Sequence, residues 1–229
     1  MNSFKILNKK DGKILSKIVL FLILISILFL IIYKYNNGFI KNKYIEKTYN
    51  LNFIENPIQI TTSLSKTIKI DNTNINLNFI AEYKIIGRVV ATTNYNGSIQ
   101  NKLSPKDVAL VWGSLSNKEV DKKIKWSSRK RKVYYSISDT KWLSGIDGKS
   151  TITSNFSNNH LIPSNDEIRN LIKSIKKDDY IKIEGYLVNV YWQTNKSRFR
   201  WNTSTTRTDT GNGACEIIYV ENITWLKNK

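Results

Sequence analysis

The stretch Y-I-K-I-E-G-Y-L-V-N-V-Y-W, from Tyr180 to Trp192, carries the clearest strand pattern of the chain. Apolar and polar residues alternate along it, and the apolar phase changes near Gly185-Tyr186. A strand whose inward face changes midway is typical of the strongly coiled strands of small barrels. This stretch therefore predicts a long, bent strand within a barrel-like sheet.

A short amphipathic helix is expected directly before this strand. Ser164-Asn165-Asp166-Glu167, which follows Pro163, has the pattern of a capping box. Apolar residues then recur at helical spacing, at Ile168, Leu171, Ile172 and Ile175. One face of this helix is therefore expected to pack on a core.

Alternating residues predict further strands before and after this helix. They lie at 58–62, 68–70, 75–79, 81–93, 133–138, 198–201 and 215–226. Gly87 interrupts one of them, which indicates a bulge or a close backbone approach. A second short helix is expected to begin at Ser104-Pro105-Lys106-Asp107 and to end at Trp112-Gly113. The predicted fold is mainly β, with one or two short helices, and resembles an OB-like small β-barrel.

The N-terminal part holds a different signal, the apolar run I-V-L-F-L-I-L-I-S-I-L-F-L-I-I-Y from Ile18 to Tyr33. As a helix this run spans about 24 Å, and flanking Lys17 and Lys34 extend its reach by snorkelling. It has no polar stripe, as a buried core helix would, and no small-residue cleavage site follows it. The run therefore predicts an uncleaved, single-pass membrane anchor.

The expected organisation follows from this anchor. A short basic cytoplasmic tail covers 1–17, the transmembrane anchor 18–35, a polar stalk 36–56 and the β-rich domain 57–229. The basic residues on the two sides of the anchor are nearly balanced, so the positive-inside rule gives only a slight bias. The very short N-terminal tail favours a domain outside the cytoplasm.

Composition narrows the classes of chemistry. The chain has 229 residues, with 36 Lys+Arg, 18 Asp+Glu, one His and one Cys. One His and one Cys do not supply the usual four-ligand zinc site, so neither a metal nor a cofactor is expected. The net charge of +18 favours polyanions such as anionic lipid, nucleic acid or cell-wall polymer, but does not choose among them.

Two partial catalytic patterns are present. Asp209-Thr210-Gly211 matches the tripeptide of aspartic proteases, but no second copy exists to share the proton. His160 and Cys215, together with an N-terminal anchor, are similar to the arrangement in sortases. The sortase pattern also requires an Arg after the Cys, which this sequence lacks. Cys215 begins an apolar strand, where a buried Cys acts as a small hydrophobe, so a cysteine transpeptidase is the least favoured alternative.

Two basic stretches are candidates for polyanion contacts. The run from Lys122 to Lys132 is either a solvated loop or an anion-binding patch. The run from Tyr191 to Trp201 interleaves aromatic and basic residues, which on an OB-like barrel would stack bases, or else would pack on the core. The candidate contacts are Lys130, Arg131, Lys196, Arg198 and Arg200.

Four stretches together resemble a family of bacterial membrane-anchored proteins that has no assigned activity. They are L-S-P-K-D-V-A-L-V-W-G at 103–113, H-L-I-P at 160–163, E-G-Y-L-V at 184–188 and S-T-T-R-T-D-T-G-N-G-A-C-E at 204–216. The resemblance implies a Gram-negative inner-membrane setting but no reaction. Relatives carry a second His where this chain has Asn155, which weighs against a two-His metal site.

If the family shares a site, its candidate residues are Trp112, His160, Arg207 and Asp209. Arg207 and Asp209 flank a Gly-rich turn, where they would pair with each other or bind a ligand. We therefore expect an extracytoplasmic domain that binds an envelope protein or an anionic polymer without catalysis. The alternative is a membrane-associated nucleic-acid-binding module.

Overall fold

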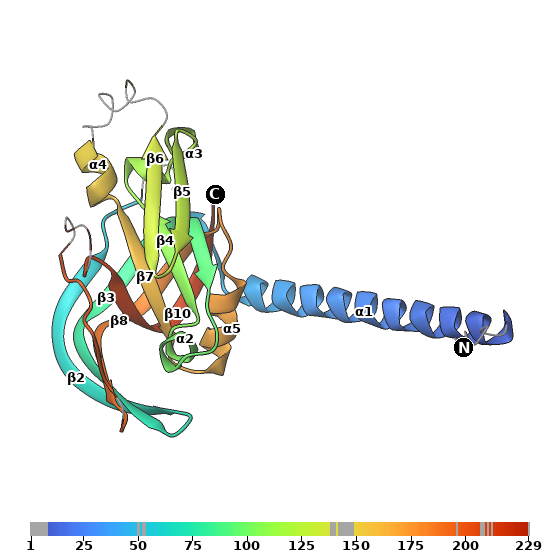
Figure 1. The fold of residues 1–229 in the computed structure, drawn as a ribbon. Coiled ribbons are helices and arrows are strands. Elements are labelled where there is room, and N and C mark those ends of the chain that lie inside the picture. The colour runs from blue at the N-terminus through green and yellow to red at the C-terminus, as the bar shows by residue number, and fades with distance from the viewer. Residues whose placement is uncertain are drawn as a thin grey trace, which may run out of the picture. The chain divides into compact units, whose positions relative to one another are not determined.

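The structure is a computed structural model that describes residues 9–49, 51, 54–137, 141, 149–195, 197–206, 209, 211 and 213–228. The chain divides into two compact units, Met1–Lys43 and Tyr44–Lys229. The first unit is the helix α1 (Lys9–Lys43), and the second holds all the strands (Figure 1).

Helix α1 contains one segment, Ile14–Tyr33, that is long and apolar enough to cross a membrane. All of its side chains in this segment are exposed to the surroundings. Ser26, the polar residue within the apolar run, donates its hydroxyl to the carbonyl of Ile23 at 2.7 Å. The helix therefore satisfies its internal hydroxyl without a partner from outside, as an apolar environment requires.

The second unit consists mainly of strands. In chain order they are β1 (Ile45–Tyr49), β2 (Ile58–Ile70), β3 (Thr73–Asn94), β4 (Lys106–Val111), β5 (Ile124–Arg129), β6 (Lys132–Ile137), β7 (Phe156–Pro163), β8 (Tyr180–Gln193), β9 (Arg198–Trp201) and β10 (Glu216–Asn228). The helices among them are α2 (Ile99–Leu103), the 3-10 turn η1 (Ser114–Ser116), α3 (Lys118–Asp121), α4 (Lys149–Ser154) and α5 (Asp166–Ser174).

Five of these strands form a closed ring. Strand β3 pairs with β4, β4 with β7, β7 with β10, β10 with β8, and β8 again with β3. The β7–β10 pair is parallel and the other four pairs are antiparallel. Helix α5 lies in sequence between the third and fourth strands of this strand ring. The prediction of a mainly β fold with a few short helices is confirmed, and its strands close into a ring.

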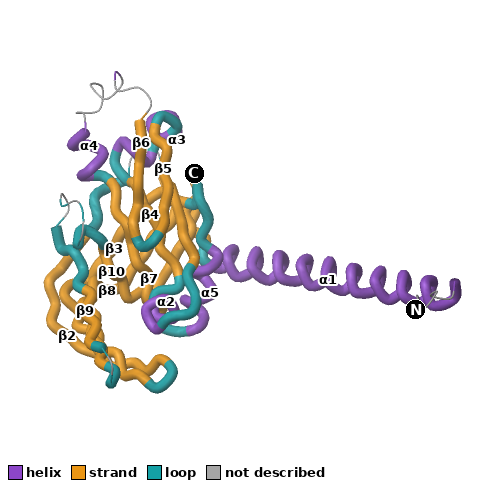
Figure 2. The backbone as a smooth tube through the Cα atoms, viewed as in Figure 1, coloured by secondary structure: helices purple, strands orange, loops and turns teal. Residues whose placement is uncertain are grey.

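The remaining strands extend the ring. Strand β2 pairs with the first half of β3, and the two strands curve together over a long distance (Figure 1). Strand β9 continues the sheet beyond β8, as Figure 2 shows, and β1 pairs in parallel with β10. Strands β5 and β6 form a separate two-stranded hairpin.

The bend predicted within Tyr180–Trp192 is present in β8. Ile181 and Ile183 are buried in its first half, whereas Val188 and Val190 are buried in its second half. Leu187 and Val188 are both buried, so the inward positions change from odd to even numbers just after Gly185-Tyr186, close to where the sequence pattern predicts. The partner β10 has a register irregularity between Val220 and Asn222, opposite this point.

Two glycines allow backbones to approach closely in the ring. A Cβ atom at Gly87 would lie 3.0 Å from the carbonyl oxygen of Val111, so the predicted close approach is confirmed. A Cβ atom at Gly185 would lie 2.0 Å from the carbonyl oxygen of Tyr219. At Gly185 any side chain would push β8 away from β10, because the obstacle is backbone and not a flexible side chain.

Helix α5 forms as expected, with one change at its start. Its N-cap is Asn165 and not Ser164, and the Asn165 side chain accepts a hydrogen bond from the backbone N–H of Ile168 at 2.9 Å. The predicted apolar face is buried at Ile168, Leu171, Ile172 and Ile175. The buried Lys106 donates its ammonium to the carbonyls of Lys173 and Ile175, which end the helix.

The helix predicted from Ser104 to Trp112 is wrong. Ser104 is instead the C-cap of α2, and Lys106–Val111 form the central strand β4, which is buried along its whole length. A strand buried on both faces is a continuous apolar run, which periodicity cannot distinguish from a helix. The neighbours β3 and β7 pair with β4 on both sides and decide the outcome.

The structure also differs from the stalk expected at 36–56. Helix α1 continues to Lys43, and β1 then adds to the edge of the sheet beside β10. Leu51 and Ile54 are buried, and Ile54 forms a β-bridge with Gly113. These apolar residues attach most of the expected stalk to the β-rich unit.

Candidate functional site

A buried cluster of charged side chains lies where β4 and β7 pair. Asp107 on β4 and His160 on β7 are register partners, and both are buried. Their side chains share a hydrogen bond of 2.7 Å between Oδ1 of Asp107 and Nδ1 of His160. The guanidinium of Arg131 donates to the same oxygen at 2.6 Å. One carboxylate therefore orients both a ring and a guanidinium.

Arg131 reaches this cluster from the tip of the β5–β6 hairpin. Lys130 and Arg131 form its two-residue turn, with positive φ angles of 49° and 64°. Such turns favour Asn-Gly, and a residue with a side chain costs about 1 kcal/mol or more in this region. Four groups besides the carboxylate hold Arg131 in place, through Asn101 Oδ1, Ser104 O, Ser104 Oγ and Asn158 Nδ2. These contacts offset the cost of the turn.

Aromatic rings surround the cluster. The guanidinium of Arg131 lies 3.7 Å from the ring centroid of Tyr95, whose hydroxyl accepts the backbone N–H of Arg131. Burial raises the pKa of Tyr95, and the charge of Asp107 raises it further. On the other side the Trp201 ring packs on His160 with centroids 4.6 Å apart.

Two members of the cluster, Arg131 and His160, reach a basic pocket of about 310 Å³. The side chains of Lys130, Lys132 and Arg200 line this pocket, and all three are exposed. Arg131, His160 and Trp201 also line it. Arg131 is paired with Asp107, whereas Lys130, Lys132 and Arg200 have no ion pair with any residue that the structure describes. The pocket therefore presents uncompensated positive charge.

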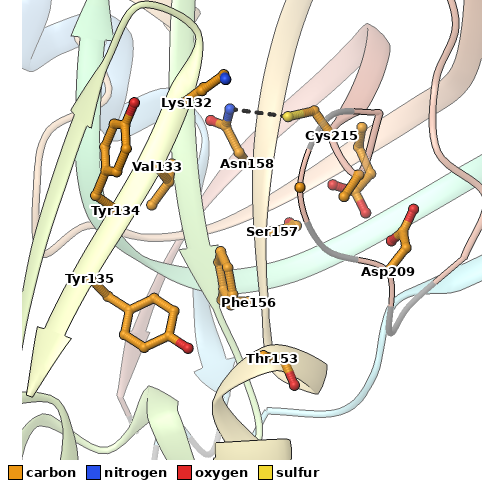
Figure 3. Close-up of a pocket in the computed structure, with 13 residues that line it drawn as sticks. Lys132, Val133, Tyr134, Tyr135, Thr153, Phe156, Ser157, Asn158, Asp209 and Cys215 are labelled. Atoms are coloured by element: carbon orange, nitrogen blue, oxygen red, sulfur yellow. Dashed lines mark hydrogen bonds between the residues drawn. The ribbon is translucent and has the colours of Figure 1, made fainter.

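A second pocket, of about 480 Å³, lies next to the first and is called the aromatic pocket below. Tyr134 and Tyr135 of β6 lie on one side of it, and Asp209 and Cys215 on the other, with β7 between them (Figure 3). Its remaining described lining residues are Lys132, Val133, Thr153, Phe156, Ser157, Asn158, Gly211, Ala214 and Glu216. The two pockets share Lys132, Gly211 and Cys215.

The candidate residues of the Gly-rich segment are only partly described. Asp209 lines the aromatic pocket, and its Oδ2 accepts the hydroxyl of Ser204 at 2.6 Å. Arg207 lies outside the described residues, so the expected pairing of Arg207 with Asp209 stays a prediction. The Ser204 bond fixes the direction of the Asp209 carboxylate in the pocket wall.

Trp112 does not meet the other candidates. It is buried at the far end of β4 from Asp107, and its indole N–H donates to Asn56 Oδ1 at 3.0 Å. It lines neither the basic nor the aromatic pocket. In the structure Trp112 joins β4 to the segment before β2.

The basic, aromatic hairpin of β8 and β9 divides into an inner and an outer face. Trp192 is buried, and its ring stacks on Phe199 with centroids 3.8 Å apart. The stacked faces of the Trp192 and Phe199 rings cover each other, so a nucleic-acid base has no room between the two rings. Arg198 is exposed and lines neither pocket, and Lys196 lies outside the described residues.

The arrangement does not activate Cys215 as a nucleophile. Its thiol contacts the side-chain amide of Asn158, 3.4 Å away, and no hydrogen bond joins it to His160 among the described residues (Figure 3). Burial raises its pKa from 9.0 to about 11. The carboxylates of Glu216 and Asp209 act in the same direction. A catalytic thiol requires the opposite shift.

Metal chemistry has little basis in the described part of the chain. No group of three or more His, Cys, Asp or Glu side chains there is arranged to hold a metal ion.

Sequence reasoning missed several residues of the site. The sequence pattern predicts a helix at Asp107, and it gives no signal for Asn158, Tyr134 or Tyr135. One signal was available, because β7 contains the polar run Ser157-Asn158-Asn159-His160 directly before an apolar one. Polar residues buried within a strand require partners. Here His160 pairs with the Asp107 carboxylate, and Asn158 donates to the carbonyl of Arg131.

Comparison with protein-family models, curated proteins and solved structures gives no match to this chain. The resemblance to a family of bacterial membrane-anchored proteins therefore stays a prediction. The site must be interpreted from its own geometry.

The raised pKa of Cys215 predicts slow reaction with thiol reagents. A shift from 9.0 to about 11 lowers the thiolate fraction near pH 8 about 100-fold relative to an unperturbed thiol. Thiol titration of the full chain in detergent with a chromogenic disulfide measures this rate. Because the chain has one Cys, the urea-denatured chain is its own control. Equal rates in the folded and denatured chain would contradict the assignment.

Proposed function

We propose that this protein is a membrane-anchored binding protein whose strand-ring unit recognises an anionic polymer. The basic pocket carries this proposal, because Lys130, Lys132 and Arg200 converge on it without described ion pairs. Acidic side chains do not line this pocket among the described residues. An anion placed there would meet three cations and the half-buried Trp201.

The geometry supports a polymer over a single small anion. Exposed cations each contribute little, because water and salt screen them. A polymer compensates by presenting many equivalent charges, and each bound segment is replaced by a neighbour when it dissociates. The net charge of +18 adds a long-range attraction that brings such a polymer to the surface.

The apolar helix supports the anchor, and we propose that residues 18–35 span the bacterial inner membrane. In this arrangement the short basic tail stays in the cytoplasm and the strand-ring unit lies outside it. The Lys residues before the apolar run favour this orientation. The polymer would then belong to the cell envelope, and another envelope protein remains the alternative partner.

Removing the three exposed cations should weaken polymer binding. The variant Lys130→Gln/Lys132→Gln/Arg200→Gln is compared with Lys69→Gln/Lys125→Gln/Lys177→Gln, which removes three exposed charges elsewhere. The probe is long-chain polyphosphate, titrated onto the full chain in nanodiscs at several salt concentrations. We expect the affinity for polyphosphate to fall at least tenfold in the first variant and less than about threefold in the control.

Equal losses in the two variants would show that only the overall charge matters, and would reject the pocket. Single-stranded DNA of matched charge is measured in parallel. Tighter binding of DNA than of polyphosphate, lost on Trp201→Ala, would favour the nucleic-acid alternative instead.

The orientation predicts the behaviour of a C-terminal reporter. A phosphatase that is active only after export, fused after Lys229, should be active in cells. A cytoplasmic reporter at the same position should be inactive. The opposite pair of results would place the strand-ring unit in the cytoplasm and contradict an envelope ligand.

A further inference from the structure

The aromatic pocket adds a second type of chemistry beside the basic pocket. The two pockets meet at Lys132, Gly211 and Cys215, so a ligand longer than one residue unit reaches both. If the proposed function holds, the two adjoining pockets also determine which class of anionic polymer fits.

Firmly held aromatic rings form one side of this pocket. Tyr135 and Phe156 pack edge to face with centroids 5.9 Å apart, and Trp126 supports both from 5.6 and 5.4 Å. Tyr134 and Tyr135 are nevertheless 42% and 36% exposed. Exposed rings that neighbours hold rigidly offer an apolar face at little entropic cost. The carbon-bound hydrogens of a sugar ring match such a face.

Hydrogen-bonding groups line the rest of this pocket. Asp209 and Glu216 contribute carboxylates and Thr153 contributes a hydroxyl, whereas the Ser157 hydroxyl is already paired with the Asn159 side chain. The amide of Asn158 donates to Arg131 O and Cys215 Sγ, whereas its buried Oδ1 has no hydrogen-bond partner among the described residues. Carboxylate and amide groups that converge opposite an aromatic face suit a ligand rich in hydroxyl donors.

These carboxylates also argue against other occupants. Asp209 and Glu216 both line the aromatic pocket, so two carboxylates lie in its wall. A continuous phosphate chain passing from the basic pocket would be repelled here. An alkyl chain would displace water from the Asp209 carboxylate without replacing its hydrogen bonds, at a cost of about 1–3 kcal/mol. A hydroxylated ring whose acidic substituent points away from these carboxylates avoids both penalties.

We propose that the aromatic pocket binds a sugar ring of an acidic polysaccharide. The acidic substituent of a neighbouring ring then lies in the basic pocket, against Lys130, Lys132 and Arg200. The volume of about 480 Å³ lies within the range of small-molecule pockets. Hydroxylated rings that carry their own acidic substituents distinguish this ligand from polyphosphate and from nucleic acid.

The test compares three probes on the full chain in nanodiscs. Polygalacturonate is acidic and hydroxylated, polyphosphate is only charged, and dextran is only hydroxylated. We expect polygalacturonate to bind at least tenfold more tightly, per anionic unit, than polyphosphate, and dextran to bind weakly. Equal affinity for polygalacturonate and polyphosphate would overturn the sugar pocket but leave the proposed function intact. Binding of neither polyanion would reject both.

Variants separate the two pockets. Tyr135→Ala should lower polygalacturonate affinity at least tenfold and leave polyphosphate affinity within about twofold, whereas Tyr135→Phe keeps the ring and should bind normally. Because Tyr135 packs on Trp126 and Phe156, the more exposed Tyr134→Ala is measured as well. If neither alanine variant lowers polygalacturonate affinity selectively, the sugar pocket is wrong.

Discussion

The buried carboxylate of Asp107 is the interaction on which the site depends. It lies on β4, which pairs with β3 and β7 in the ring. It shares hydrogen bonds with His160 on β7 and with Arg131 at the hairpin tip. Burying a carboxylate costs several kcal/mol unless charged partners and hydrogen bonds compensate. The partners here come from elements far apart in sequence, so compensation requires the complete arrangement. The carboxylate thereby selects one position for the β5–β6 hairpin, which has no strand pairing with the ring among the described residues.

Both pockets follow from that position. The Arg131 carbonyl accepts the Asn158 amide, which ties the turn to β7. Lys130 and Lys132 flank Arg131 and so line the basic pocket, while Tyr134 and Tyr135, further along β6, line the aromatic pocket. A second bond, from Thr93 to Ser128 O at 2.7 Å, holds the other strand of the hairpin to β3. Separate anchors on the two strands make the hairpin a fixed wall.

Sequence reasoning located the elements whose period is clear. Local patterns predict the bend in β8, the close approach at Gly87 and the apolar face of α5. The tertiary structure agrees with each of these patterns. It failed at β4, where a strand covered on both faces loses its alternation. It also failed at β1, where five polar and apolar residues become a strand because β10 offers an edge.

The site was harder to predict than the fold. His160 was identified, but its partner Asp107 is 53 residues away in the sequence and their meeting depends on the β4–β7 register. Arg131 was identified as one member of a basic run, and nothing in that run distinguishes the paired arginine from its exposed neighbours. The positive φ at Lys130 and Arg131 is equally invisible, because neither residue type signals it. Local sequence encodes the strands, whereas the charged cluster is a property of their assembly.

The most direct test is a double-mutant cycle between Asp107 and Arg131. Urea unfolding of the full chain in detergent is measured for Asp107→Asn, Arg131→Gln and the double variant. The exposed pair of Asp71 with Lys102 serves as the reference cycle, for which less than about 1 kcal/mol is expected. We predict a coupling free energy of about 2 kcal/mol or more for Asp107 and Arg131. A coupling no larger than that of the exposed pair would contradict the view that this interaction holds the hairpin and shapes the site.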